Sequence, residues 1–267
     1  MPKSNLYIIE GLPCSGKSLT SKYVSDVLKS HGKNVIYVDE GTGNHPADYE
    51  FHSFISEKSL SEFSEQEQKI ILGCSEQKCD GYIVALSALS GELFEKALKY
   101  KIYDFLDWNT EKNIMLEKWR EFSKSGTDSI YVFNCCLLQN PMCETMMRFG
   151  FDIQTSKEYI MKICDIIKPL NPSVIYLANS NIEQSIRKAV PERGMEWLNN
   201  VIEYHINGGY GKSKELKGFD GYISCLEERQ KRELQILDNL PVHSLVIKNA
   251  QADWNHSYDK IQDFIID

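Results

Sequence analysis

Eight consecutive residues near the N-terminus, Gly11-Leu12-Pro13-Cys14-Ser15-Gly16-Lys17-Ser18, constrain the fold of this chain more than any other segment. They match the pattern G-x-x-x-x-G-K-[ST] at every fixed position. An apolar run at 6–9 precedes them, and residues 18–28 place apolar side chains at helical spacing. Strand, glycine loop and helix form the arrangement that this pattern requires. The motif therefore predicts an α/β fold with a phosphate-binding loop between its first strand and first helix.

The residue types in this loop suit a polyphosphate ligand. Gly11 and Gly16 let the backbone curve around phosphates without a side chain in the way. The inward-pointing N–H groups and the start of the helix then attract negative charge. Lys17 adds a positive charge for the β- and γ-phosphates, and the Ser18 hydroxyl can bind Mg²⁺. We expect a nucleotide to contact Gly11, Pro13, Cys14, Ser15, Gly16, Lys17, Ser18 and Leu19.

The composition indicates a folded globular protein, because 42% of the 267 residues are hydrophobic and 25% are charged. This length suits one domain spanning 1–267 with an insertion. The formal net charge of −8 argues against general nucleic-acid binding. No stretch reaches the length of a membrane span, and the N-terminus does not resemble a signal peptide, so we expect a cytoplasmic protein without a membrane partner. The eight cysteines are then expected to be free thiols.

Five short segments rich in Val and Ile are interpreted as buried strands. They lie at 6–10, 34–39, 129–134, 173–178 and 244–248. Helical segments alternate with them, which predicts an α/β fold with a parallel sheet covered by helices on both faces. About ninety residues separate the second strand from the third, far more than a usual crossover. We interpret 41–128 as a helical insertion that covers the substrate at the carboxyl ends of the strands.

Two acidic residues, Asp39 and Glu40, follow the second strand, where a carboxylate would face the crevice beside the γ-phosphate. Phosphoryl transfer to a hydroxyl needs a group that accepts the proton and orients the nucleophile. Neighbouring side chains in a strand alternate in direction, so only one of these acids readily faces the ligand. We expect one of them to be this base, and Ser18 and Glu40 to hold the metal. The alternative is a solvated loop carboxylate.

Other polar residues are candidates for holding the phosphate acceptor. The third strand ends at Asn134, where many phosphate-loop NTPases carry an acidic residue that organises Mg²⁺. The metal ligands are therefore expected to come from Ser18, phosphates, water and a carboxylate after the second strand. Gln139 and Asn140 are neutral hydrogen bonders that suit a base, sugar or polyol. The candidate substrate residues are His45, Asp48, Arg120, Asn134, Gln139 and Asn140.

The segment after the fourth strand carries arginines that suit a lid over a triphosphate. Arg187 lies in a predicted short helix and Arg193 in the loop after it, where guanidinium groups would neutralise charge in the transition state. We assign 181–215 to this lid region. Residues 207–214 contain a second Gly-Lys-Ser, but the first glycine of the motif is missing because position 206 is Ile206. We therefore interpret 207–214 as a mobile loop.

These segments resemble nucleoside and nucleotide kinases of the phosphate-loop superfamily. Residues 9–18 look like the opening of thymidylate kinases and deoxynucleoside kinases, which also carry Glu-Gly at the loop entrance. Asp39-Glu40-Gly41 is placed like the acidic residue after their second strand, which is the general base in deoxynucleoside kinases. Residues 175–177, followed by an arginine-bearing helix, resemble their fourth strand and lid. The resemblance implies a five-stranded sheet in the order 2-3-1-4-5, with ATP and Mg²⁺ as cofactors.

The resemblance is confined to the scaffold, about half of the chain, and 41–128 has no match. Those families end the third strand with an acidic residue followed by arginine, whereas this chain has Asn134-Cys135, so the substrate stays open. Residues 133–136 (Phe-Asn-Cys-Cys) and 45–48 (His-Pro-Ala-Asp) are similar to segments of uncharacterised bacterial phosphate-loop proteins, which implies no activity. Kinases that inactivate antibiotics share the scaffold and also use a carboxylate after the second strand as base.

The leading hypothesis is an ATP- and Mg²⁺-dependent kinase for a small molecule, such as a nucleoside, a nucleotide or an antibiotic-like hydroxyl compound. Its catalytic residues would be Lys17, Asp39, Glu40, Arg187 and Arg193. One alternative is a regulatory NTPase that changes partners with its nucleotide, and another is a scaffold that binds phosphate weakly. ATP is preferred over GTP because no Asn-Lys-x-Asp motif is present. The acceptor is not identified, and a homodimer is left open.

Overall fold

The computed structural model describes residues 4–125 and 129–266 of the chain. These residues divide into two compact units, one formed by 1–40 together with 123–267 and the other by 41–122. The first unit contains the phosphate-loop motif. The second unit lies within the segment interpreted as an insertion.

A five-stranded parallel sheet forms the centre of the first unit. Its strands are β1 (Leu6–Gly11), β2 (Val35–Val38), β6 (Ile130–Asn134), β7 (Ser173–Ala178) and β8 (His243–Lys248). They lie in the order β2-β6-β1-β7-β8, and all neighbours are parallel. In chain order this is 2-3-1-4-5, so the predicted sheet and its order are confirmed. Because β1 is central, the loop that follows it opens at the middle of the carboxyl edge of the sheet.

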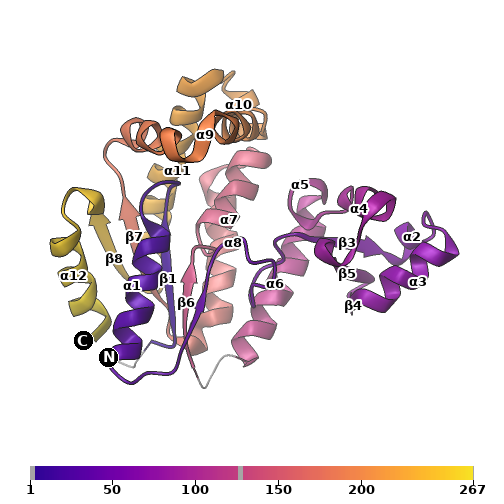
Figure 1. Ribbon diagram of the computed structural model, residues 1–267, viewed down its shortest axis with the longest axis horizontal. Coiled ribbons are helices and arrows are strands. Elements are labelled where there is room, and N and C mark those ends of the chain that lie inside the picture. The colour runs from indigo at the N-terminus through magenta and orange to yellow at the C-terminus, as the bar shows by residue number, and fades with distance from the viewer. Residues whose placement is uncertain (1–3, 126–128, 267) are drawn as a thin grey trace. The chain divides into compact units, whose positions relative to one another are not determined.

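Helices cover both faces of this sheet, because its central strands carry apolar side chains on both sides. The covering helices are α1 (Lys17–Ser30) and α12 (Trp254–Ile266) on one face, and α8 (Ile153–Ile167) and α11 (Gly218–Leu237) on the other (Figure 1). Alternate residues of β1, Tyr7 and Ile9, share a core cluster with Val24 of α1 and Ile261 of α12. All six residues of β1 are buried, including its one charged residue, Glu10.

Helix α9 (Ile182–Ile206) lies beyond the carboxyl ends of the strands (Figure 1). Its buried residue Ile186 belongs to the same apolar cluster as Leu12 of the phosphate loop and Tyr222 of α11. The helix bends at Gly194, where φ is 89° and ψ is 162°. The region interpreted as a lid therefore contains a long bent helix whose first part packs against the loop.

The interpretation of 207–214 as a mobile loop is wrong, because this segment forms helix α10 (Gly209–Ser213) and packs closely against its neighbours. A Cβ at Gly208 would lie 2.3 Å from the carbonyl oxygen of Met147, and one at Gly209 would lie 2.7 Å from that of Arg148. These glycines thus permit backbone-to-backbone contact. Glycine enrichment alone does not separate a close approach of this kind from a flexible loop.

Short elements connect the longer ones at both edges of the sheet. After β6 come α7 (Gln139–Met142) and a π-helical turn (Cys143–Arg148). Two 3₁₀ turns, Lys168–Leu170 and Ala250–Ala252, precede β7 and α12. The turn after β6 contacts Glu10, the residue directly before the phosphate loop, and Gln251 of the turn before α12 donates a hydrogen bond to Cys14 of the loop.

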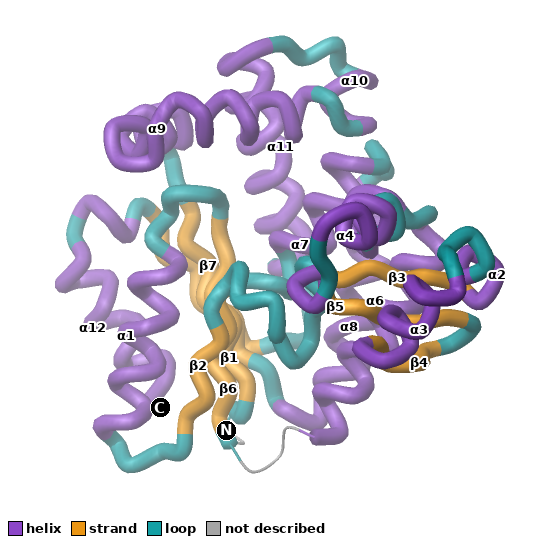
Figure 2. The backbone as a smooth tube through the Cα atoms, turned by 45° about the vertical axis from the view of Figure 1, so that its right-hand side comes forward, coloured by secondary structure: helices purple, strands orange, loops and turns teal. Residues whose placement is uncertain are grey.

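The interpretation of 41–128 as a helical insertion is incomplete. The second unit also contains a three-stranded antiparallel sheet (Figure 2). The strands are β3 (His52–Ser56), β4 (Ser75–Lys78) and β5 (Gly81–Ala85), in the order β3-β5-β4. The helices are α2 (Glu57–Leu60), α3 (Glu65–Cys74), α4 (Gly91–Leu98), α5 (Ile102–Phe105) and α6 (Trp108–Ser125). The last residues of α6 belong to the first unit. Residues Leu86–Ala88 form a 3₁₀ turn. Ile55 and Val84 join Ile71 of α3 in the core of this unit. The apolar runs in these strands are so short that periodicity does not separate them from buried helix.

Two expectations from composition can be compared with the structure. All eight cysteines are free, as predicted. Within residues 4–125 and 129–266, no helix combines the length and the apolar character needed to cross a bilayer.

Gly208→Ala should destabilise the protein by about 1–3 kcal/mol, because the added methyl group would overlap the Met147 carbonyl. Gly73→Ala is the matched control. Gly73 lies inside α3, and a methyl group added there would meet nothing within 4 Å, so this change should stabilise the helix by up to about 1 kcal/mol. Urea unfolding measures both changes. An unchanged free energy of unfolding for Gly208→Ala would contradict the close packing of α10.

The buried side chain of His205 should make the protein sensitive to acid. Burial lowers the pKa of His205 from 6.5 to about 4, although a 2.6 Å contact between Nδ1 and the Val201 carbonyl oxygen partly opposes this change. The unfolded chain therefore binds more protons between these values, so this contribution to stability is complete above pH 6.5 and is lost as the pH falls toward 4. Substitution His205→Phe should flatten the pH dependence of the free energy of unfolding in this range. Equal slopes for the two proteins would contradict a neutral, buried His205.

Candidate functional site

The phosphate loop turns from β1 into α1 with backbone angles that only glycine adopts readily. Gly11 has a φ of 146° and Gly16 a φ of 99°. A Cβ at Gly11 would lie 2.7 Å from the Leu177 carbonyl oxygen, and one at Gly16 would lie 2.4 Å from the ring of Trp254. No side chain caps the N-terminus of α1, so its first N–H groups are left for a ligand. The local geometry is therefore that of an anion-binding loop.

The polar side chains of the loop also fit a bound polyphosphate. Lys17 is 7% exposed, and its ammonium donates to the Leu12 carbonyl oxygen at 3.1 Å. The hydroxyl of Ser15 is buried and makes no hydrogen bond with any residue that the structure describes. A buried polar group without a partner is costly, and an anionic oxygen in the loop would satisfy it. Ser15 and Lys17, together with the loop amides, would hold the phosphates.

Asn134 connects the loop to the carboxylate of Asp39. Its side-chain amide donates to Ser18 Oγ at 3.1 Å and to Asp39 Oδ1 at 2.7 Å. Asn134 is 1% exposed, and its own Oδ1 lacks a hydrogen-bond partner among the described residues. The sequence predicts Ser18 and Glu40 as the metal pair, whereas the structure joins Ser18 to Asp39. Ser18 and Asp39 offer the oxygen atoms that Mg²⁺ prefers.

Within residues 4–125 and 129–266, no three His, Cys, Asp or Glu side chains come together to bind a metal ion. A magnesium ion here would therefore depend on phosphate oxygens and water beside Ser18 and Asp39. This is the usual manner in which Mg²⁺ is bound in phosphoryl-transfer sites.

Glu40 lies apart from this bridge and has a different partner. Its Oε1 accepts a hydrogen bond from Gln139 Nε2 at 2.5 Å, and its side chain is exposed. Gln139 is buried, and its Oε1 makes no hydrogen bond within the described chain. Asn140 is half-buried, and Cys135 Sγ lies 4.0 Å from its side-chain oxygen. The two acids after β2 are thus separated: Asp39 is tied to the loop serine, and Glu40 is held beside Gln139.

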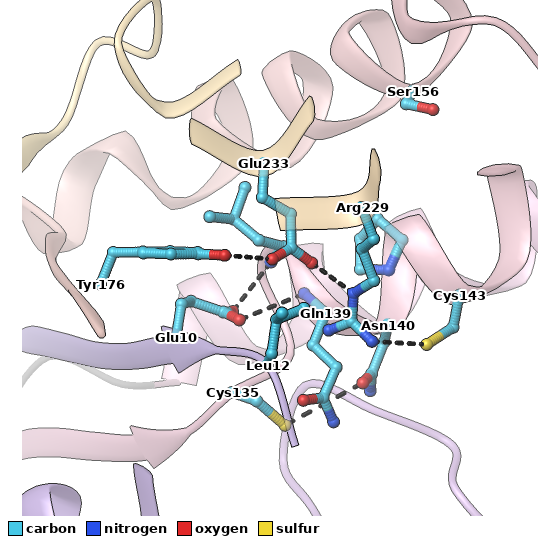
Figure 3. Close-up of polar contacts among 12 residues, drawn as sticks. Glu10, Leu12, Cys135, Gln139, Asn140, Cys143, Ser156, Tyr176, Arg229 and Glu233 are labelled. Atoms are coloured by element: carbon cyan, nitrogen blue, oxygen red, sulfur yellow. Dashed lines mark hydrogen bonds and ion pairs between the residues drawn. The ribbon is translucent and has the colours of Figure 1, made fainter. Parts of the chain in front are cut away.

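Sequence reasoning assigned no role to Glu10, although a charged residue in an apolar strand is a visible signal. Its carboxylate accepts N–H groups from Leu137 at 2.7 Å, Leu138 at 2.8 Å and Gln139 at 3.1 Å. Burial raises the pKa of Glu10 to about 7, and the backbone donors only partly oppose this rise. Figure 3 shows Glu10 beside Tyr176, Gln139 and the residues of α11.

A buried ion pair on α11 lies next to Glu10 (Figure 3). Arg229 and Glu233 are 2.6 Å apart and almost fully buried, and Tyr176 donates its hydroxyl hydrogen to Glu233 at 2.6 Å. Arg229 also contacts Cys143 Sγ at 3.4 Å. Spacing of i and i+4 on a helix predicts the pair but not its burial, which is why the sequence did not identify it.

The two arginines of the predicted lid lie on α9 and are exposed. Arg187 pairs with Glu183 at 2.7 Å and stacks over Phe219, whereas Arg193 lies over the ring of Trp197 at 5.0 Å. Burial raises the pKa of Cys14, and the charge of Arg193 is the first of the opposing influences, followed by Lys17. Arg193 is therefore close enough to the loop to act on it electrostatically.

A cavity of about 280 Å³ lies beside the loop, at the ends of β7 and β8. Its lining is rich in side-chain amides: Asn179, Asn181, Gln184, Asn249 and Gln251, with Ser15 and Lys188. The Gln251 side chain donates to the Cys14 carbonyl oxygen, which connects this cavity to the loop. The sequence signal for this cavity is the set of polar residues that follow the fourth and fifth strands. No role was assigned to these amide residues from the sequence.

Three candidate substrate residues belong to the second unit. His45 and Asp48 are buried there; His45 Nδ1 accepts from the Ala47 amide, and Asp48 accepts from the Tyr49 amide and the Tyr103 hydroxyl. Arg120 is exposed and pairs with Glu117 at 2.9 Å. Their assignment to an acceptor stays a prediction.

Comparison with known proteins gives one family match and one structural likeness to report. The family model described as chromatin associated protein KTI12 matches residues 1–70, about a quarter of the chain. The YorR protein from Bacillus subtilis, solved in complex with phosphorylated GDP, covers 97% of this chain and 95% of its own, with 12% identity and a TM-score of 0.41. A likeness at that score supports no conclusion about this chain. No curated protein sequence matches it.

The family match spans the phosphate loop, α1, β2 and the acids that follow. Together with the loop motif and the strand order β2-β6-β1-β7-β8, it supports a nucleotide-binding protein of the phosphate-loop NTPase superfamily.

Proposed function

We propose that this chain is an ATP- and Mg²⁺-dependent kinase that transfers the γ-phosphoryl group to a small molecule carrying a hydroxyl or phosphate. The observation that carries this proposal is the side-chain bridge from Ser18 through Asn134 to Asp39. The bridge holds the Asp39 carboxylate near Ser18, the residue proposed to bind the metal, and Glu40 is the next residue in the chain. Phosphoryl transfer needs both a metal-organising group and a group that orients the nucleophile.

Each residue of the site has a distinct role in this proposal. The loop amides and Lys17 bind the phosphates, and Ser18 and Asp39 hold the metal with water. When bound, Mg²⁺ neutralises negative charge on the phosphates. Glu40 accepts the proton of the acceptor hydroxyl, because it is exposed and Gln139 holds its carboxylate in place. Arg193, whose charge already acts on Cys14, stabilises charge on the transferred group.

The cavity between the ends of β7 and β8 is the proposed site of the nucleotide base. It borders Ser15 of the loop, and its amide side chains both donate and accept hydrogen bonds. Such groups can recognise the edge of a purine without a charge. ATP is the proposed donor, and the acceptor class of nucleosides, nucleotides or antibiotic-like hydroxyl compounds comes from the resemblance alone.

A regulatory NTPase is the second candidate, and Asn134 is the observation that favours it. A neutral amide at this position gives the metal no carboxylate from β6, which suits slow turnover. The two functions differ in their response to acceptors. A kinase consumes ATP faster when its acceptor is present, whereas equal hydrolysis with and without a metabolite mixture, and no phosphorylated product, would favour the regulatory protein.

Lys17→Ala should abolish stabilisation by ATP. A ligand at one hundred times its dissociation constant stabilises a protein by about 2.7 kcal/mol, and the variant should lose this effect because the phosphates lose their positive partner. A thermal-shift series with ATP and Mg²⁺ provides the measurement. Lys22→Ala, an exposed lysine on the same helix, is the matched control and should keep the full shift. The same shift for both variants would argue against binding in the loop.

Substitutions at the two acids should have separable effects. Asp39→Asn should weaken the dependence of ATP binding on Mg²⁺, because it removes a carboxylate beside Ser18. Glu40→Gln should leave that dependence unchanged and slow phosphoryl transfer by about 10²–10⁴-fold, the usual contribution of a general base. Calorimetry with and without Mg²⁺, and product formation with an acceptor found by metabolite screening, measure the two effects. Wild-type transfer by Glu40→Gln would remove Glu40 from the proposed chemistry.

A further inference from the structure

The buried carboxylate of Glu10 has no part in the roles given above. It lies in the central strand directly before Gly11, is fully buried, and contacts the turn after β6. Three backbone N–H groups, from Leu137, Leu138 and Gln139, converge on it at 2.7–3.1 Å. Hydrogen bonds to an ionised carboxylate are stronger than those between neutral groups.

The turn that Glu10 holds has an unfavourable backbone. Cys135 and Cys136 have φ values of 68° and 92°, so two consecutive residues other than glycine adopt left-handed conformations. Such a conformation persists only where the surroundings over-determine it. The Cys135 amide donates to the Ile9 carbonyl oxygen at 2.9 Å, and Glu10 binds the next three residues after Cys136. Residues of β1 therefore hold both ends of this turn.

The same turn determines where both acids after β2 are held. Asn134 directly precedes it and donates to Ser18 and Asp39. Gln139 ends it, binds Glu10 through its backbone and donates to Glu40 through its side chain. The carboxylate of Glu10 thus binds Gln139, the partner of Glu40, and holds the turn that begins directly after Asn134, the partner of Asp39.

We propose that Glu10 is a positioning residue, whose buried carboxylate holds residues 137–139 so that Asn134 and Gln139 keep Asp39 and Glu40 in place beside the loop. The catalytic consequence of this inference rests on the proposed function. The role of Glu10 in holding the turn does not depend on it. Ionised Glu10 holds the turn most strongly, and protonation weakens its bonds to the three N–H groups. Because burial raises the pKa of Glu10 to about 7, this change falls near neutral pH.

Other charged and titratable groups also face Glu10. They are Glu233 and Arg229 of α11, Lys17 of α1, Tyr176 of β7 and Cys135 after β6. Glu233 raises the pKa of Glu10 and Lys17 lowers it. Glu233 is equally buried but is bound to Arg229 and Tyr176, and no hydrogen bond to residues 137–139 is seen for it in the described chain. It therefore serves as a control that removes one buried negative charge without touching the turn.

The test compares Glu10→Gln with Glu233→Gln. Amide hydrogen exchange at Leu137, Leu138 and Gln139 should become at least tenfold faster in Glu10→Gln and stay within threefold of wild type in Glu233→Gln. Glu10→Gln should also need at least tenfold more Mg²⁺ for half-maximal ATP hydrolysis, while its affinity for ATP without Mg²⁺ stays within threefold. Unchanged exchange in Glu10→Gln, or equal effects of both variants, would overturn the proposal.

The wild-type protein gives a second test if either variant does not fold. The amide ¹H and ¹⁵N shifts of Leu137, Leu138 and Gln139 should titrate together with a midpoint near pH 7, and Mg²⁺-dependent hydrolysis should rise with pH around the same midpoint. Amide shifts that stay constant between pH 5.5 and 8.5 would overturn the proposal. These shifts require no activity, so a protein that shows the titration but binds no ATP would refute the proposed function and leave the role of Glu10 in holding the turn intact.

Discussion

The left-handed backbone at Gly11 and Gly16 sets the geometry of the whole site. It lets the chain leave a central strand and enter α1 without a side-chain cap, so the amides at the helix start are left for an anionic ligand. Leu177 packs against Gly11 and Trp254 packs against Gly16, and neither contact leaves room for a Cβ. The loop shape is therefore held by its neighbours as well as by its own sequence.

Neutral side chains do much of the organising around this loop. Asn134 connects Ser18 to Asp39, and Gln139 holds Glu40. The charged groups behind them, Glu10 and the pair of Arg229 with Glu233, are almost fully removed from solvent. Buried charges are tolerated only when they are paired or hydrogen-bonded, and each of these carboxylates has such partners. The site thus combines buried, paired charges with the side-chain amides of Asn134 and Gln139, which hold the two acids after β2.

Much of the fold could be predicted because its signals are local. The strands of the parallel sheet are short apolar runs bounded by polar residues, and the loop motif identifies β1 among them. The antiparallel sheet of the second unit was missed because runs such as Phe54-Ile55 are too short to show a period. Helix α10 was missed because glycine has two opposite uses, flexibility and close packing, and the sequence around Gly208 does not separate them.

Local sequence was enough to predict the phosphate loop, the parallel sheet and the carboxylates after β2, since each of these follows from residues near one another in the chain. Three features emerge only when the chain is folded: Asn134 links Ser18 to Asp39; Glu10 holds the turn after β6; and amides from two strand ends line one cavity. Each depends on strand register: Val38 pairs with Phe133, Ile9 with Asn134, and Ala178 with Lys248. These pairings bring together residues far apart in the chain, and no local pattern in the sequence records them.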